Sequence, residues 1–98
     1  MYKKKEGFSE ATIKAVWKKA KPAMGNDLNL VRKDSCGAWI KWSEYGNVQS
    51  QFGWEVDHIK PSSIGGSDFL ANLQPLQWEN NRYKSDNYPR WTCKVKAA

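Results

Sequence analysis

Residues 54–86, with the sequence WEVDHIKPSSIGGSDFLANLQPLQWENNRYKSD, constrain the fold more than any other part of the chain. Residues 54–59 alternate apolar and polar side chains, which is typical of a half-buried strand. A loop with two consecutive glycines follows, and then a short extended segment, NLQPL, at 72–76. Residues 77–86 contain neither glycine nor proline and are compatible with a helix. We therefore expect a strand, a loop, a second extended segment and a helix in this order.

The remaining sequence predicts one further helix and one further strand. Ser9 is a suitable N-cap for a helix over 9–21, in which four apolar residues recur at helical spacing: Ile13, Val16, Trp17 and Ala20. The short aromatic and β-branched run AWIKW at 38–42 predicts a strand. Residues 22–37 and 43–53 are rich in turn-forming residues and are expected to be irregular connections. Together these elements predict a small α+β protein with a flexible basic arm at residues 1–8 and a single domain at 9–98.

Charge and cysteine content narrow the function classes. The 98 residues include 16 Lys plus Arg and 10 Asp plus Glu, a net charge of +6, which favours a polyanionic partner such as nucleic acid. Most of the six tryptophans are expected to pack in or near the core. We expect neither a signal peptide nor a membrane span, and hence a cytoplasmic protein. In a reducing cytoplasm Cys36 and Cys93 are expected to be free thiols, with a single disulfide as the alternative.

Residues that suit metal-assisted chemistry follow the first predicted strand of 54–86. Asp57 directly precedes His58, the only histidine, and Asn72 and Asn81 follow at intervals of 14 and nine positions. The oxygens of Asp57 and Asn81 suit Mg²⁺ or Mn²⁺ rather than Zn²⁺, and an imidazole beside such an ion can take a proton from water. Strand alternation places Asp57 and His58 on opposite faces, so we expect a twist or bulge before Pro61. Asn72 can hydrogen-bond back across the loop and fix the orientation of the imidazole.

This region resembles the HNH nucleases. The resemblance is carried by Asp57-His58, SSIGGSDFLAN, NLQPL and WENNRYKSD, in the variant whose last motif position is asparagine, and CGAWIKWSEYGN upstream is also similar to small bacterial members. It implies a ββα-metal core: a two-stranded hairpin and a helix around one divalent ion, Mg²⁺ or Mn²⁺. No Cys-x-x-Cys pair is present, so a structural zinc is not expected.

The resemblance also assigns roles. Asp57 matches the acidic metal ligand and His58 the general base. Asn72 matches the orienting position. Asn81 matches the last metal ligand, and Asn80 is its rival in register. The expected contacts to nucleic acid are Lys60, Arg82 and Lys84.

The implied activity is metal-dependent hydrolysis of phosphodiester bonds in DNA. One ion and one base act on one strand, so a monomer or weak homodimer should nick DNA with weak sequence preference. Two alternatives remain open at this point. One is a DNA-binding module that keeps the fold but not the reaction, and the other is an RNA-directed or toxin-type nuclease.

Overall fold

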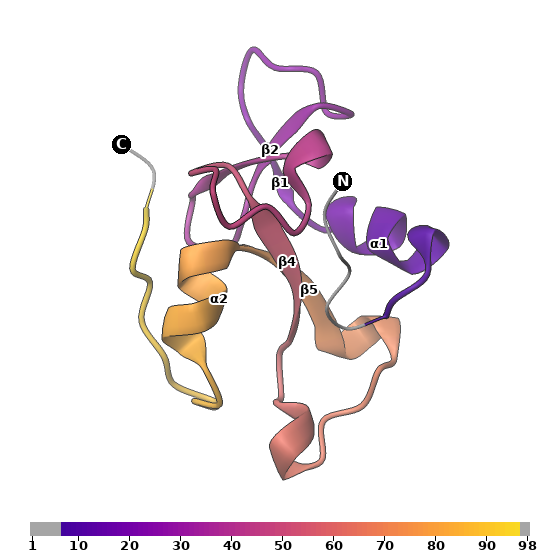
Figure 1. Cartoon of the computed structure of the whole chain (residues 1–98), viewed down its shortest axis with the longest axis vertical. Helices are drawn as coiled ribbons and strands as arrows, with labels where there is room; N and C mark the ends of the chain where they lie inside the picture. The colour runs from indigo at the N-terminus through magenta and orange to yellow at the C-terminus, as the bar shows by residue number, and fades with distance from the viewer. Residues whose placement is uncertain (1–6, 97–98) are drawn as a thin grey trace.

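Two antiparallel sheets and two short helices make up the computed structural model, which describes residues 7–96. β4 (Trp54–His58) and β5 (Leu73–Gln77) pair along their whole length at the centre of the molecule (Figure 1). α1 (Glu10–Trp17) packs against β5, and α2 (Trp78–Lys84) packs against both strands. The predicted α+β class is confirmed, as are both elements predicted as helices.

α1 begins where the sequence indicated. The Ser9 Oγ accepts a 3.1 Å hydrogen bond from the Thr12 backbone N–H, which satisfies one of the free donors of the first turn. The helix ends at Trp17, earlier than predicted, because the chain turns through residues 18–20 and then enters β1 (Lys21–Pro22).

The second sheet contains strands that the sequence did not predict. β1 pairs with β2 (Val31–Lys33), and β2 pairs with β3 (Trp39–Lys41), both antiparallel. The expectation of an irregular connection at 22–37 was therefore wrong for β2. A three-residue strand between turns has too little alternation to stand out in sequence, and its pairing with β3 defines it.

The core lies between α1 and the strands. It is formed by residues of α1, β3, β4 and β5 and by one residue of the turn after α1: Ile13, Val16, Trp17, Ala20, Ile40, Trp54, Val56 and Leu73. The rings of Trp17 and Trp54 lie 5.2 Å apart and each contacts Trp42, at 5.7 and 6.0 Å. Trp17 and Trp54 are buried as expected, whereas Trp39 is 40% exposed on the second sheet.

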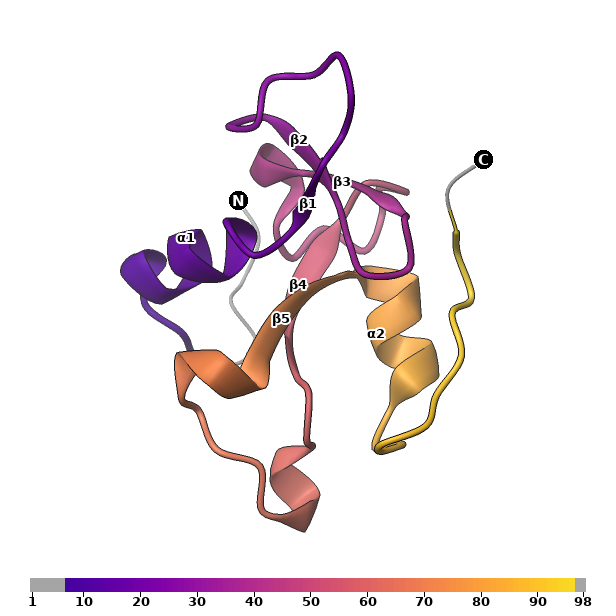
Figure 2. The ribbon, with the colours of Figure 1, turned by 180° about the vertical axis from the view of Figure 1, so that it is seen from behind.

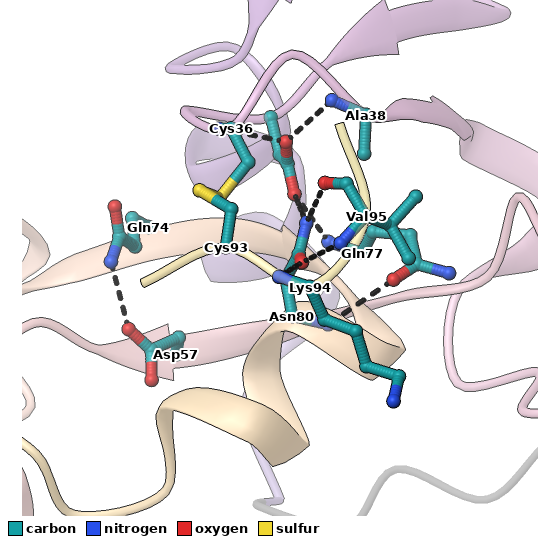
Figure 3. Close-up of a disulfide and its surroundings, with 10 residues drawn as sticks. Cys36, Ala38, Asp57, Gln74, Gln77, Asn80, Cys93, Lys94 and Val95 are labelled. Carbon is teal, nitrogen blue, oxygen red and sulfur yellow. Dashed lines mark hydrogen bonds between the residues drawn. A yellow bond between two sulfur atoms is a disulfide. The ribbon is translucent and has the colours of Figure 1, made fainter. Parts of the chain in front are cut away.

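The two cysteines form a disulfide, which corrects the expectation of free thiols (Figure 3). Cys36 precedes β3 and Cys93 lies in the C-terminal segment, yet their Cα atoms are only 5.8 Å apart. The segment runs beside α2 in Figures 1 and 2, so packing that the sequence does not show brings the two thiols together. The disulfide fastens this segment to the loop before β3.

The first six residues of the predicted basic arm lie outside the described residues. Phe8, the last residue of that arm, packs partly buried against the core. Within residues 7–96, neither helix has the length and apolar character needed to cross a membrane.

Candidate functional site

An open hollow of about 260 Å³ lies where β4 ends beside α2. We call it the Asp57 hollow, and its lining residues are Val56, Asp57, His58, Pro61, Ser62, Asn81, Arg82, Ser85 and Asp86. The structure thus brings Asp57, His58 and Asn81 to one cavity, although they come from a strand and a helix. The predicted bulge is not needed, because β4 and β5 pair in regular register through His58↔Leu73. The chain turns just beyond this pair, and both side chains border the hollow.

Asp57 is a buried carboxylate held by two neighbours. Its Oδ2 accepts a 2.8 Å hydrogen bond from the Gln74 amide on the paired strand (Figure 3). Its Oδ1 lies 3.4 Å from the ammonium of Lys84. Burial raises the pKa of Asp57 above its usual range, and the Gln74 hydrogen bond and the Lys84 charge oppose that rise. The carboxylate is therefore fixed in position, and a further cation would offset the cost of its burial.

His58 is oriented by an aspartate from the following loop. Its Nε2 lies 2.7 Å from Asp68 Oδ1, while the Phe8 ring lies 5.8 Å from the imidazole ring. A carboxylate beside Nε2 favours a proton on that nitrogen, which leaves Nδ1 as the acceptor. Within residues 7–96 no hydrogen-bond partner contacts Nδ1. The imidazole is thus arranged to accept a proton at a defined atom.

Asn72 closes the loop that carries Asp68. Its Oδ1 accepts a hydrogen bond from the Lys60 N–H, and its Nδ2 donates to the carbonyls of Lys60 and Ser67. The side chain bonds back across the loop as predicted, but it does not line the Asp57 hollow. Gly66 is required inside this loop, because a Cβ there would lie 1.6 Å from the Lys60 carbonyl oxygen. Asn72 therefore acts on the loop next to Asp68 rather than on His58 directly.

Asn80 and Asn81 occupy different environments. Asn81 lines the hollow and donates a 2.9 Å hydrogen bond to Glu55 Oε1. No donor among the described residues reaches its Oδ1. Asn80 is fully buried and bonds to Asp34 and to the C-terminal segment (Figure 3). Of the two asparagines, only Asn81 is placed to present an oxygen to the hollow.

The three residues expected to contact nucleic acid differ in accessibility. Lys84 is fully buried, and its ammonium donates to the His58 carbonyl at 2.9 Å, so the expectation that it faces phosphate was wrong. Its alkyl chain and charge are used inside the protein to hold the end of β4. Arg82 is 46% exposed and pairs with Glu55 at 3.0 Å on the rim of the hollow. Lys60 is exposed on the loop after β4.

The donors in the hollow fit a largely hydrated divalent ion. Asp57 supplies a carboxylate and Asn81 an amide oxygen, and Mg²⁺ and Mn²⁺ retain waters at such sites. Among residues 7–96 no group of three or more His, Cys, Asp or Glu side chains gathers to hold a metal. The Lys84 ammonium beside Asp57 also repels a cation. We therefore expect a hard ion to bind only weakly at Asp57 and Asn81.

Several residues that shape the site were not among those predicted from the sequence. Asp68 orients His58, Gln74 holds Asp57, and Glu55 holds both Asn81 and Arg82. Gln74 is directly opposite Asp57 in the sheet, a position that strand register alone could have indicated. Asp68 lies in a loop, where no periodicity indicates which side chain reaches the histidine.

Any assignment of function to this chain rests on its own residues and their geometry. No family model, curated protein or solved structure matches this chain.

Proposed function

We propose that this protein is a metal-dependent endonuclease that hydrolyses phosphodiester bonds in DNA. The observation that carries the proposal is that Asp57, His58 and Asn81 line one open hollow. The succession of β4, β5 and α2 around these residues supports an HNH-type ββα core. The net charge of +6 supports a polyanionic substrate.

His58 is the general base in this proposal. Asp68 holds Nε2, and Nδ1 takes a proton from the water that attacks phosphorus. The bond from phosphorus to the leaving oxygen breaks as the bond to water oxygen forms, and the leaving oxygen takes up a proton from solvent. Arg82, on the rim, attracts the phosphodiester. Asn72 is a positioning residue, because it fixes the loop that presents Asp68.

Asp57 and Asn81 would hold one Mg²⁺ or Mn²⁺. Such an ion supplies positive charge that stabilises the phosphoryl oxygens as negative charge develops on them. With one base and one ion site per chain, a monomer cuts one strand, and cutting of both strands requires a weak homodimer or two events. The short elements around the hollow offer few side chains for reading base edges, which favours weak sequence preference.

Supercoiled plasmid tests the proposal directly. Wild-type protein is incubated with plasmid and Mg²⁺ or Mn²⁺, with and without EDTA, and the nicked form is quantified. We expect nicking only with the divalent ion, and a loss of about 100-fold or more in His58→Gln, which can still hydrogen-bond Asp68. Lys14→Ala, on α1 away from the hollow, is the control. Ion-independent nicking, or full activity in His58→Gln, contradicts the proposal, and binding without cutting indicates an inactive DNA-binding module.

A further inference from the structure

Two further hollows lie beside the Asp57 hollow. The Tyr83 hollow, about 270 Å³, is lined by Trp78, Glu79, Arg82, Tyr83 and Lys94. The Trp39 hollow, about 340 Å³, is lined by Trp39, Gln51, Phe52, Gln77, Glu79, Val95 and Lys96. Arg82 borders both the Asp57 and Tyr83 hollows, and Glu79 borders both the Tyr83 and Trp39 hollows. α2 therefore contributes to all three hollows, and the C-terminal segment, which contributes to two of them, runs beside α2 (Figure 2).

Aromatic rings are accessible in both additional hollows. Tyr83 is 53% exposed and Trp39 is 40% exposed, so part of each ring is open to a ligand. A lysine ammonium lies over each ring: Lys94 at 5.7 Å from the Tyr83 centroid, and Lys33 at 5.9 Å from that of Trp39. Each ring thus has a positive charge next to it: Lys94 lines the Tyr83 hollow, and Lys33 lies on β2, paired with Trp39.

The sheet that bears Trp39 adds further lysines on the same face. Strand register places Lys21, Lys33 and Trp39 side by side across β1, β2 and β3, and Lys41 is two residues from Trp39 along β3. Lys21 and Lys33 are direct cross-strand neighbours. Like charges opposite one another destabilise a sheet, and an anionic partner relieves that repulsion. Charge complementarity therefore points to a polyanion.

Glu79 is the one carboxylate among the described residues that line these two hollows, against three cationic side chains: Arg82, Lys94 and Lys96. Its side chain accepts a 3.3 Å hydrogen bond from Gln77. A carboxylate at the junction of the two hollows disfavours phosphate there and can accept hydrogen bonds from base amino groups. The bases, and not the backbone, should face α2 at this point.

We propose that the Tyr83 and Trp39 hollows form a binding track for single-stranded DNA, with bases stacked on Tyr83 and Trp39 and phosphates beside Lys94, Lys96 and Lys33. Stacking needs unpaired bases, because a duplex covers both faces of each base. The track binds DNA without His58 or a metal, so it goes beyond the nuclease proposal. One part of the inference rests on the proposed function: if the track continues into the Asp57 hollow, the substrate of the nuclease is an unpaired strand.

Fluorescence anisotropy in EDTA tests the track without cleavage. The probes are a labelled 12-nucleotide single strand of mixed sequence and the duplex of the same length. We expect the single strand to bind at least threefold more tightly than the duplex. Loss of one stacked base costs about fivefold or more in affinity, so Trp39→Ala and Tyr83→Ala should each weaken single-strand binding by that factor. Trp39→Phe, which keeps a ring, should stay within about twofold.

A matched pair of double variants separates the track from net charge. Lys94→Ala/Lys96→Ala and Lys14→Ala/Lys18→Ala each remove two positive charges, but Lys14 on α1 and Lys18 directly after it line a different hollow. We expect the first to weaken single-strand binding at least threefold more than the second. Glu79→Gln should tighten binding about twofold. Each variant is first checked for an unchanged thermal melting curve, and Tyr83→Ala serves where Trp39→Ala does not fold.

Equal affinity for duplex, unchanged binding in both ring variants, or equal losses in the two lysine pairs would each overturn the track. These results are independent of the nuclease proposal, since the assay contains no divalent ion. If the protein binds single strands preferentially but never nicks plasmid, the track is supported and the nuclease proposal is contradicted. If it nicks plasmid but binds duplex equally well, the nuclease proposal is supported and the track is contradicted.

Discussion

Asn80 and Asn81 are consecutive residues of α2, but the first holds the C-terminal segment and the second lines the Asp57 hollow. The Asn80 Oδ1 accepts hydrogen bonds from the N–H groups of Lys94 and Val95, and its Nδ2 donates to Asp34 and to the Val95 carbonyl. Among the described residues the Asn81 side chain makes one hydrogen bond, which its Nδ2 donates to Glu55. Adjacent and chemically identical side chains therefore have separable roles in stability and in the candidate site.

Substitution of each asparagine by alanine should separate those roles. Asn80→Ala leaves several buried partners unpaired, so we expect the free energy of unfolding in urea to fall by about 2 kcal/mol or more. Asn81→Ala should change it by less than about 1 kcal/mol while raising the Mg²⁺ or Mn²⁺ concentration needed for half-maximal nicking. An Asn81→Ala protein with the wild-type metal titration curve would show that this side chain is not a ligand.

Asp68 should affect activity only through His58. In Asp68→Asn we expect the nicking rate to fall on the order of tenfold with no change in melting temperature, because Asp68 is exposed but fixes the imidazole. The same substitution in a His58→Gln background should cause no further loss. Additive losses in this double-mutant cycle would mean that Asp68 acts independently of His58.

The buried carboxylate of Asp57 predicts a particular pH dependence of stability in EDTA. Burial raises its pKa in the folded protein above the ordinary 3.8, so in the window just above that value the folded state keeps a proton that the unfolded state has released. The contribution of Asp57 to the free energy of unfolding therefore falls as pH rises through the raised pKa. We expect the difference in the free energy of unfolding between wild type and Asp57→Asn to decrease as pH rises across this window. Urea titrations at several pH values measure this difference. A difference that stays flat or increases would show that burial does not dominate at this carboxyl.

The Cys36–Cys93 disulfide closes a loop between cysteines 57 positions apart, so reduction should destabilise the fold. Loop-closure entropy gives an upper value of about 4 kcal/mol for the loss in unfolding free energy, measured in urea with and without reductant. Reduced protein should also be cut faster by trypsin at Arg90 and Lys94, because the segment then loses its covalent link and is held by noncovalent contacts such as the Asn80 hydrogen bonds. Cys36→Ser/Cys93→Ser is the control, since reductant should not change its stability. Equal stability of oxidised and reduced wild type contradicts this role.

The local elements could be predicted from the sequence because short-range patterns encode them. The alternation at 54–59 predicted β4, and the spacing of Ile13, Val16 and Trp17 predicted α1. The intervals between Asp57, Asn72 and Asn81 indicated candidate site residues, of which Asp57 and Asn81 line the hollow. Each of these signals depends on neighbours a few residues apart or on a recurring spacing.

Tertiary structure decided what depends on residues distant in the chain. Lys84 became a buried partner of Asp57 rather than a phosphate contact, Cys36 met Cys93, and Asp68 rather than Asn72 reached the imidazole. No local pattern carries this information, because burial and pairing follow from how α2, the loop after β4 and the C-terminal segment pack together. The sequence by itself determined the helices, the main strands and the candidate chemical groups, and packing determined which of those groups face one another.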